Sequence, residues 1–271
     1  MSTFVAHTSP TGTSNLLAVL IGLSLALLTL TAASGAVDPR ILNGDPVWAK
    51  PFKFSLSFLV LFLTLSWLES RLSERWREGW ILSCTRIAMT ISFLAEMSYI
   101  SYQAALGEPS HFNYSSDFHA AMYSLVMFTG AVVLTLGIGV FAIAASMDND
   151  AYISRPLRLA VALGFGVSCI LTLIIGSYMG GQNSSFVGAP SAHSAYVPFL
   201  GWSLEAGDLR VSHFFALHAM QFIPGMALLI EKHRALSNRV PCVLFLFTIS
   251  YIALTLALFF QAISGQPMFS T

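Results

Sequence analysis

The chain has 271 residues, of which 55% are hydrophobic and only 10% are charged, and its mean hydropathy is +0.71. A soluble domain carries about 25% charged residues, so these charges are too few to coat a water-soluble globule of this size. The 13 basic and 13 acidic residues balance to zero net charge, which excludes the basic surplus that nucleic-acid binding needs. The composition therefore predicts a membrane protein whose main partner is lipid.

Seven apolar segments are long enough to cross the hydrocarbon core, which takes about 20 residues of helix. The predicted spans are residues 15–36, 50–68, 80–104, 118–146, 157–179, 209–230 and 241–264. The fold class is therefore all-α, and residues 1–271 are expected to form a single transmembrane domain with seven helices. The first span also has the length of a signal-peptide core, although residues 1–14 lack the basic residues that precede such a core.

The basic residues between the spans are unevenly distributed. One set of alternate connections holds eight of them: Arg71, Arg75, Arg77, Arg155, Arg158, Lys232, Arg234 and Arg239. The opposite set holds three: Arg40, Lys50 and Arg210. Because cytoplasmic loops carry the excess of Lys and Arg, we expect a cytoplasmic N-terminus and an outer C-terminus, in a bacterial inner membrane.

The longest outer connection, residues 180–208, is rich in Gly, Ser and Pro and has no helical period. Long loops in compact proteins are usually functional or disordered. We expect this loop to form an ordered cap over the outer ends of the helices.

One short phrase occurs twice, at the ends of the third and the seventh span. Residues 102–109 read Tyr-Gln-Ala-Ala-Leu-Gly-Glu-Pro, and residues 260–267 read Phe-Gln-Ala-Ile-Ser-Gly-Gln-Pro. The match suggests that spans one to three and spans five to seven are copies of one unit, with the fourth span as a linker. Such a parallel 3+1+3 repeat is also the layout of SWEET transporters, whose motifs this chain lacks.

The proposed repeat also matches polar residues between its two copies. Gln103 corresponds to Gln261, and Lys53 corresponds to His213. Lys53 and His213 would lie near the outer mouth of the helix bundle, so the matched pairs are candidates to line one polar pocket.

Ionisable residues inside the spans are costly and usually face the bundle interior or a cavity. At 1.5 Å per residue, Glu96 lies about 12 Å, and His218 about 15 Å, below the outer ends of their helices. A carboxylate and an imidazole at similar depth are natural partners, and we expect Glu96 and His218 to form a catalytic acid–base pair. The alternative is a structural hydrogen bond between helices. Arg86 lies near the cytoplasmic end of its span and is expected to extend to the lipid headgroups.

Further polar residues are predicted to line a pocket around this pair. Tyr99 and Gln103 follow Glu96 at i+3 and i+7, and Gln221 follows His218 at i+3, so each set shares one helix face. The predicted ligand-binding residues are Lys53, Tyr99, Gln103, Gln221, Gln261, Asp208 and Arg210.

The histidines leave a metal site open. His213 and His218 are five residues apart, about 140° around a helix, which is not the i, i+4 spacing of a zinc-binding helix. A metal would therefore need ligands from different helices, and the candidate set for zinc or iron is His213 with His111 and His119.

Three functions remain open at this point. The first is a binding or catalytic site reached from the outer side, for a metal, a lipid, a quinone-like molecule or a small polar solute. The second is a small-solute or proton-coupled transporter, which needs a polar path to the cytoplasm, where Arg86 stands nearly alone. The third is a structural or accessory subunit of a larger membrane complex. The expected protein partner is a second copy of this chain or an unidentified subunit of such a complex. We favour the first, because the polar groups gather on one side of the membrane.

Overall fold

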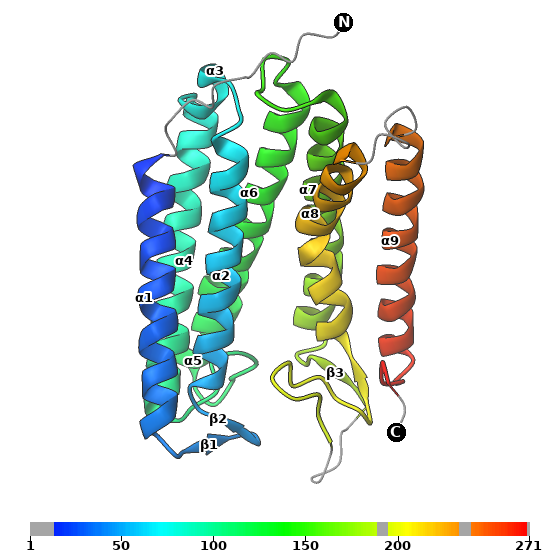
Figure 1. The fold of residues 1–271 in the computed structure, drawn as a ribbon. Coiled ribbons are helices and arrows are strands. Elements are labelled where there is room, and N and C mark those ends of the chain that lie inside the picture. Colours follow the sequence, from blue (N-terminus) through cyan, green and yellow to red (C-terminus); the bar gives the residue numbers. More distant parts are fainter. Residues whose placement is uncertain (1–13, 189–194, 233–239, 270–271) are drawn as a thin grey trace, which may run out of the picture. The chain divides into compact units, whose positions relative to one another are not determined.

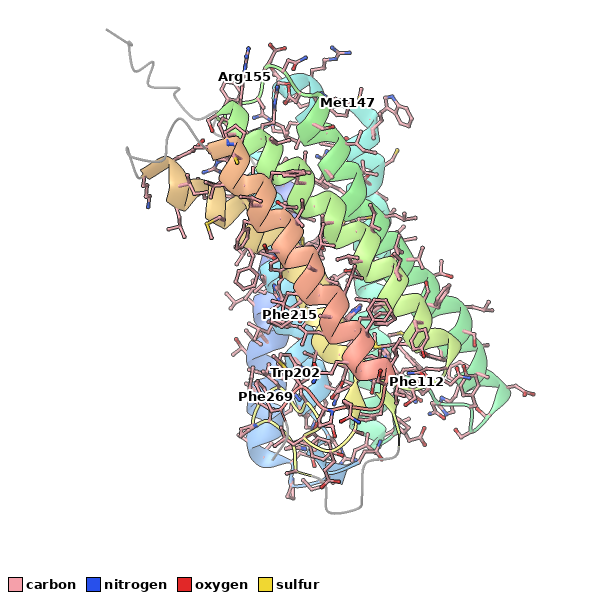
Figure 2. The ribbon with its side chains drawn as sticks, turned by 90° about the vertical axis from the view of Figure 1, so that its right-hand side faces the viewer. Phe112, Met147, Arg155, Trp202, Phe215 and Phe269 are labelled. Atoms are coloured by element: carbon pink, nitrogen blue, oxygen red, sulfur yellow. The ribbon has the colours of Figure 1, made fainter. Side chains whose placement is uncertain are left out.

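The computed structural model describes residues 14–188, 195–232 and 240–269, which form two compact units divided between Ile153 and Ser154. Each unit is a bundle of helices with one short two-stranded sheet (Figure 1). In each unit we call the end that carries this sheet the sheet end. Figure 2 labels Phe112 near the sheet end of the first unit, and Trp202 near that of the second.

The elements follow one another in chain order within each unit. The first unit contains α1 (Asn15–Val37), β1 (Ile41–Leu42), β2 (Asp45–Pro46), α2 (Ala49–Glu69), α3 (Glu74–Arg77), α4 (Trp80–Leu106), α5 (Asp117–Ala121), the π-helix η1 (Met122–Met127) and α6 (Phe128–Met147). The second unit contains α7 (Arg155–Gly181), β3 (Phe186–Val187), β4 (Gly207–Asp208), α8 (Leu209–Lys232) and α9 (Val240–Ile263).

Seven of the described helices are long and apolar enough to cross a membrane: α1, α2, α4, the continuous rod from α5 through η1 to α6, α7, α8 and α9. This confirms the predicted all-α fold, and each predicted span ends within two residues of the observed helix. Large apolar side chains such as Ile91, Leu125 and Leu229 are exposed on these helices, as expected where the surrounding solvent is lipid. Arg234 and Arg239, used above for the orientation, lie outside the described residues.

Serine hydroxyls cap the first helix of each unit. Ser14 Oγ accepts a hydrogen bond from the Leu17 N–H, and Ser154 Oγ accepts one from the Leu157 N–H. Each hydroxyl satisfies a backbone donor that has no partner within its own helix. Pro156 lies in the first turn of α7, where its missing N–H removes no helical hydrogen bond.

Aromatic side chains fill the space between α2 and α4. Phe58 and Phe62 of α2 pack edge-on against Phe93 of α4, with ring centroids 4.9 and 5.2 Å apart. Between α4 and α6, Met89 lies against Gly137, and a Cβ at this glycine would come within 2.5 Å of the Met89 Sδ. The glycine therefore allows α4 and α6 to pack closely.

In the second unit, α7 packs on α8 along a row of small residues at four-residue spacing: Gly164, Ser168, Thr172 and Gly176. A Cβ at Gly164 would lie 2.9 Å from the Ala219 carbonyl oxygen, and Ser168 Oγ donates to the Leu217 carbonyl at 2.9 Å. Rows of small residues let membrane helices approach closely where lipid removes the hydrophobic drive to associate.

The two repeated phrases form the same helix end. Gly107 and Gly265 both have left-handed backbone, with φ of 76° and 75°. The side-chain amides of Gln103 and Gln261 each donate to the carbonyl of the proline six residues later, at 3.2 and 2.6 Å. The glycine permits the left-handed turn, and the glutamine secures the chain that leaves the helix.

Each unit also places an antiparallel pair of strands between its first two spans. Asn43 and Gly44, both with positive φ, turn β1 back onto β2. Strand β3 pairs with β4, and Gly207 of β4 lies against α9, since a Cβ there would fall 2.0 Å from the Ala262 carbonyl oxygen. Within the predicted cap loop, residues 189–194 lie outside the described part of the chain.

Candidate functional site

The Glu96 side chain lies inside the first unit on α4. The residue is only 4% exposed, and its Oε1 is buried with no hydrogen-bond partner among the described residues. An unsatisfied buried polar group costs about 1–3 kcal/mol, and more when it is charged. Native proteins satisfy nearly all such groups, so an exception calls for a specific explanation, such as a ligand.

The opposite wall at Glu96 is a glycine of α6. A Cβ at Gly130 would lie 2.8 Å from Glu96 Oε1, so the absence of a side chain makes the space for the carboxyl group. The six-residue π-helix η1 ends at Met127, three residues before Gly130, and the chain continues as α6. Turns of π-helix are rare and frequently occur at functional sites. The spacing of apolar residues did not predict this π-helix.

Hydrogen bonds link the polar face of α4 to the sheet end of the first unit. The Tyr99 hydroxyl lies 3.2 Å, and the Gln103 Nε2 3.3 Å, from Nδ1 of His119. On the other side of the ring, His119 Nε2 lies 3.2 Å from Glu108 Oε2. The structure thus brings together Tyr99, Gln103 and His119 from the predicted site, and it adds Glu108, which the sequence analysis did not select.

His111 lies among aromatic rings rather than among ligands. The rings of Phe54 and Tyr123 lie 5.5 and 5.9 Å from the His111 ring, and Ser110 Oγ lies 3.3 Å from His111 Nδ1. Burial, with a smaller contribution from the Lys50 ammonium group, lowers the pKa of His111 well below its ordinary value. The imidazole is therefore neutral and held by packing.

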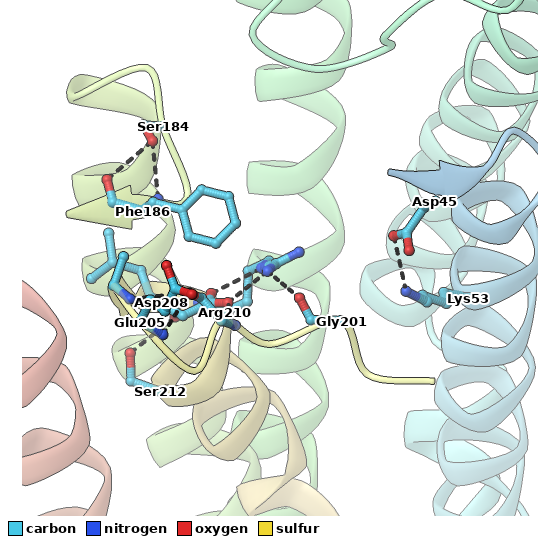
Figure 3. A network of polar contacts seen from close by, with 12 residues as sticks. Asp45, Lys53, Ser184, Phe186, Gly201, Glu205, Asp208, Arg210 and Ser212 are labelled. Atoms are coloured by element: carbon cyan, nitrogen blue, oxygen red, sulfur yellow. Dashed lines mark hydrogen bonds and ion pairs between the residues drawn. The ribbon is translucent and has the colours of Figure 1, made fainter. Parts of the chain in front are cut away.

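Ion pairs and hydrogen bonds hold the connection between α1 and α2 against α2 and α4. Arg40 donates through Nε and Nη2 to Asp38 at 3.0 and 2.7 Å, and through Nη1 to the Ala105 carbonyl at 3.0 Å. The hydrogen bonds from Arg40 hold the pKa of the Asp38 carboxyl well below its ordinary value. Lys53, a predicted ligand-binding residue, lies 3.7 Å from the Asp45 carboxylate (Figure 3).

In the second unit, Asp208 and Arg210 hold the loop onto the start of α8 (Figure 3). Arg210 donates through Nε and Nη2 to Asp208 at 2.9 and 2.6 Å, and it also donates to the Gly201 carbonyl. Asp208 accepts from the Ser203 N–H at 2.9 Å, and the guanidinium carbon of Arg210 lies 4.7 Å from the centre of the Phe186 ring. These two predicted ligand-binding residues are thus engaged by the protein itself.

The structure pairs two of the other predicted residues of the second unit, His218 and Gln221, and places His213 against α7. His213 faces Gly176 of α7, whose added Cβ would lie 3.6 Å from His213 Cε1. His213 Nδ1 and Thr172 Oγ1 are buried without a hydrogen-bond partner in the described part of the chain. His218 Nδ1 lies 3.2 Å from Gln221 Oε1, as the i+3 spacing predicts. The expected pairing of Glu96 with His218 would join residues of both units and stays a prediction.

A second buried cluster lies at the end of the first unit opposite its sheet, and it corrects one prediction. Arg86 does not extend to the headgroups; its guanidinium is buried and bonds to the Glu69 carboxylate. Glu69 Oε2 also accepts from the Ser14 N–H at 2.9 Å, and nearby Asp148 accepts from the Ser73 N–H at 2.6 Å. Sequence reasoning missed Glu69, because the predicted second span ends at residue 68 and leaves Glu69 outside it.

No three His, Cys, Asp or Glu side chains of residues 14–188, 195–232 and 240–269 gather into a group that could hold a metal ion. The candidate zinc or iron set of His213, His111 and His119 therefore has no support from the described geometry.

Comparisons with protein-family models, with curated proteins and with solved structures gave no match. The fold defines a class, an all-α protein with seven helices of membrane-spanning length. Any assignment beyond this class rests on the chemistry of the residues themselves.

Proposed function

We propose that this integral membrane protein binds a small polar ligand at Glu96, and that the ligand donates hydrogen bonds. The observation that carries the proposal is the Glu96 Oε1, which is buried beside Gly130 and has no partner among the described residues. A carboxyl group in this position is costly unless a bound molecule satisfies it.

The unsatisfied atoms on this face of α4 indicate the chemistry of the ligand. Besides Glu96 Oε1, the Gln103 Oε1 is buried and lacks a partner within the described residues. Both atoms are oxygens, which accept hydrogen bonds, so the matching groups on a ligand are hydroxyl, amine or amide N–H donors. Tyr99 lies between them on the same face and supplies a hydroxyl as well as an apolar ring.

We further propose that the ligand enters from outside the cell. The distribution of Lys and Arg favours an inner-membrane protein with its N-terminus in the cytoplasm, which puts the sheet end of the first unit outside. Glu108, with a side chain 45% exposed, would then lie at the mouth of the site.

The test is ligand-dependent stability of the purified protein in detergent. A ligand that binds only the folded state stabilises it by about 2.7 kcal/mol at 100 times its Kd. We would screen amino alcohols, primary amines and hydroquinone, each beside an alkylated analogue that lacks its donor hydrogens. We expect one donor compound to raise the unfolding temperature of the native protein and to lose this effect in Glu96→Met.

The matched control is Glu74→Gln, which changes an exposed carboxylate of α3 and should respond to the compound like the native protein. The proposal is wrong if every compound acts equally on the native protein and Glu96→Met. It is also wrong if the alkylated analogues stabilise as well as the donors.

A second candidate function, a proton-coupled transporter, is favoured by the buried cluster of Glu69, Arg86 and Asp148. These residues supply polar groups at the end of the first unit opposite the Glu96 network, where the sequence had indicated little besides Arg86. Uptake of the identified compound into proteoliposomes under a pH gradient, lost in Glu96→Met, would support transport. Binding without uptake would leave the protein a receptor or an enzyme.

We also propose that α1, α2 and α4 are copies of α7, α8 and α9 in a parallel repeat. The matching glutamine-secured helix ends and the strand pair within the first connection of each unit support this proposal. An accessory role in a larger complex remains the third candidate, and stable partners after purification in mild detergent would favour it.

A further inference from the structure

We infer that Glu108, His119 and Tyr99 form a proton path between the outer surface and Glu96. The inference rests on the proposed site at Glu96 and adds to it that ligand binding is linked to exchange of a proton with outer water.

The outer part of the path begins at a carboxylate in contact with solvent. The Glu108 side chain is 45% exposed, and its Oε2 lies 3.2 Å from Nε2 of His119, whose side chain is largely buried. In the neutral imidazole one ring nitrogen donates and the other accepts, so Nε2–H donates to the carboxylate and Nδ1 is left as an acceptor.

The inner part of the path continues from Nδ1. The Tyr99 hydroxyl donates to Nδ1 at 3.2 Å, and the Gln103 amide, which is anchored to the Pro109 carbonyl, also reaches Nδ1 at 3.3 Å. Tyr99 is buried and lies one helical turn from Glu96, with about 5–6 Å between their Cβ atoms. The path also requires a link between the Tyr99 hydroxyl and the Glu96 carboxyl, and a bridging water molecule is the link that we propose.

The transfer balances without any other reactant. On release, the Glu96 O–H gives its proton to the Tyr99 oxygen while the Tyr99 O–H gives its own to His119 Nδ1. The Nε2–H of His119 then passes to Glu108, and Glu108 releases a proton to water. Tyr99 and His119 end neutral, with the imidazole in its other tautomer, and Glu96 ends as a carboxylate. Uptake is the reverse sequence.

The surroundings of His119 favour this role over that of a fixed cation. The groups that contact its ring nitrogens are Tyr99 and Gln103 from α4 and Glu108 from the segment before α5. Asp117, at the start of the same helix, is exposed. His119 therefore has a group that can give or take a proton at each ring nitrogen, Tyr99 at Nδ1 and Glu108 at Nε2, as a proton path requires.

The experiment is infrared spectroscopy of the full chain in proteoliposomes, with no ligand added. The carboxyl C=O band that disappears in Glu96→Gln belongs to Glu96, and replacing the outer water with D₂O shifts this band as its proton exchanges. We expect exchange to slow about tenfold or more in His119→Phe and in Glu108→Gln, and to stay unchanged in Glu74→Gln.

Because Glu108 is partly exposed, Glu108→Gln keeps the test valid if His119→Phe fails to fold. Unchanged exchange in Glu108→Gln overturns the inference, as does the absence of any Glu96 band between about pH 5 and pH 9. The ligand screen separates this result from the proposed function. If His119→Phe and Glu108→Gln exchange the Glu96 proton as fast as the native protein and still bind the ligand, only the proton path is refuted. If exchange slows in these variants but no compound in the screen stabilises the native protein, only the binding function is refuted.

Discussion

Replacing Arg86 with methionine should destabilise the first unit by about 3–5 kcal/mol, because it leaves the Glu69 carboxylate buried without its cation. Glu69 is 0% exposed and Arg86 is 8% exposed, so water cannot take over the lost contact. Arg86 also donates to the Arg77 carbonyl at 3.0 Å and to Ser83 Oγ at 2.9 Å, and methionine makes neither bond. This loss is a large part of the 5–15 kcal/mol by which a typical protein is stable.

A double-mutant cycle measures this coupling. Glu69→Met together with Arg86→Met removes both charges and should recover most of the loss, since apolar side chains of similar size can replace a buried ion pair. About 1–3 kcal/mol should remain lost, because the Ser14 N–H no longer has its Glu69 acceptor and the Arg77 carbonyl and Ser83 Oγ no longer have Arg86 as a donor. The assay is reversible denaturation in mixed micelles. Arg75→Met, on the exposed side of α3, is the control and should change stability by less than about 0.5 kcal/mol. Additive losses in the double variant would refute the reasoning.

Three further predictions concern single positions. Gly164→Ala should cost about 1–3 kcal/mol, because its Cβ would lie 2.9 Å from a backbone oxygen of α8. Gly166→Ala should be neutral or stabilising, because no atom of the described residues lies within 4 Å of the added Cβ. Thermal unfolding of the two variants compares these costs directly. Lowering the pH from about 7 to about 5 should destabilise the native protein more than it destabilises His111→Phe. The pKa of His111 is depressed in the folded state, so the unfolded chain takes up the proton first. The stability of the native protein therefore falls as the pH drops below the ordinary pKa of histidine. Denaturation at both pH values checks the sign, and equal losses would contradict it. Asp208→Ala should cost about 1.5–3 kcal/mol, because it removes the buried carboxylate that accepts two hydrogen bonds from Arg210. Asp45→Ala should cost less than about 1 kcal/mol, because the Asp45–Lys53 pair is exposed. Similar losses of stability in the two variants would contradict this ranking.

The spans were predictable from the sequence because the membrane imposes one length and one polarity on every helix. Seven long apolar runs bounded by polar or charged residues leave little choice of where the helices end. The same reasoning placed Tyr99 and Gln103 on the face of Glu96, since i+3 and i+7 positions share one side of a helix.

The partners of these residues were not predictable from the sequence, because helix periodicity gives no register between helices. Gly130 lies opposite Glu96, and Glu69 meets Arg86 from 17 positions earlier, on another helix. The π-helix η1 left no mark in the apolar pattern, since it lies inside one continuous hydrophobic run. Arg86 was predicted to extend to the lipid headgroups because Glu69 was not recognised as its partner.

The predicted site residues that instead bond to the protein itself show a further limit of sequence reasoning. Gln261 resembles a site residue in the sequence, yet its amide secures the end of α9, as Gln103 does for α4. Asp208 and Arg210 fasten a loop. A polar residue near the end of a span often completes backbone hydrogen bonds that the helix leaves open, and only the structure separates this role from ligand binding.

The most direct test of the account is covalent labelling of the native protein in its membrane with dicyclohexylcarbodiimide. This apolar reagent adds to protonated carboxyl groups. Burying a carboxyl group without a cation partner costs less free energy when the group is protonated, and Glu96 has no such partner among the described residues. We predict that peptide mass spectrometry finds the label on Glu96 and not on Glu69, whose carboxylate is held by Arg86. Label on Glu69 with Glu96 unmodified would contradict the claim that the Glu96 carboxyl is the one without a protein partner among the described residues.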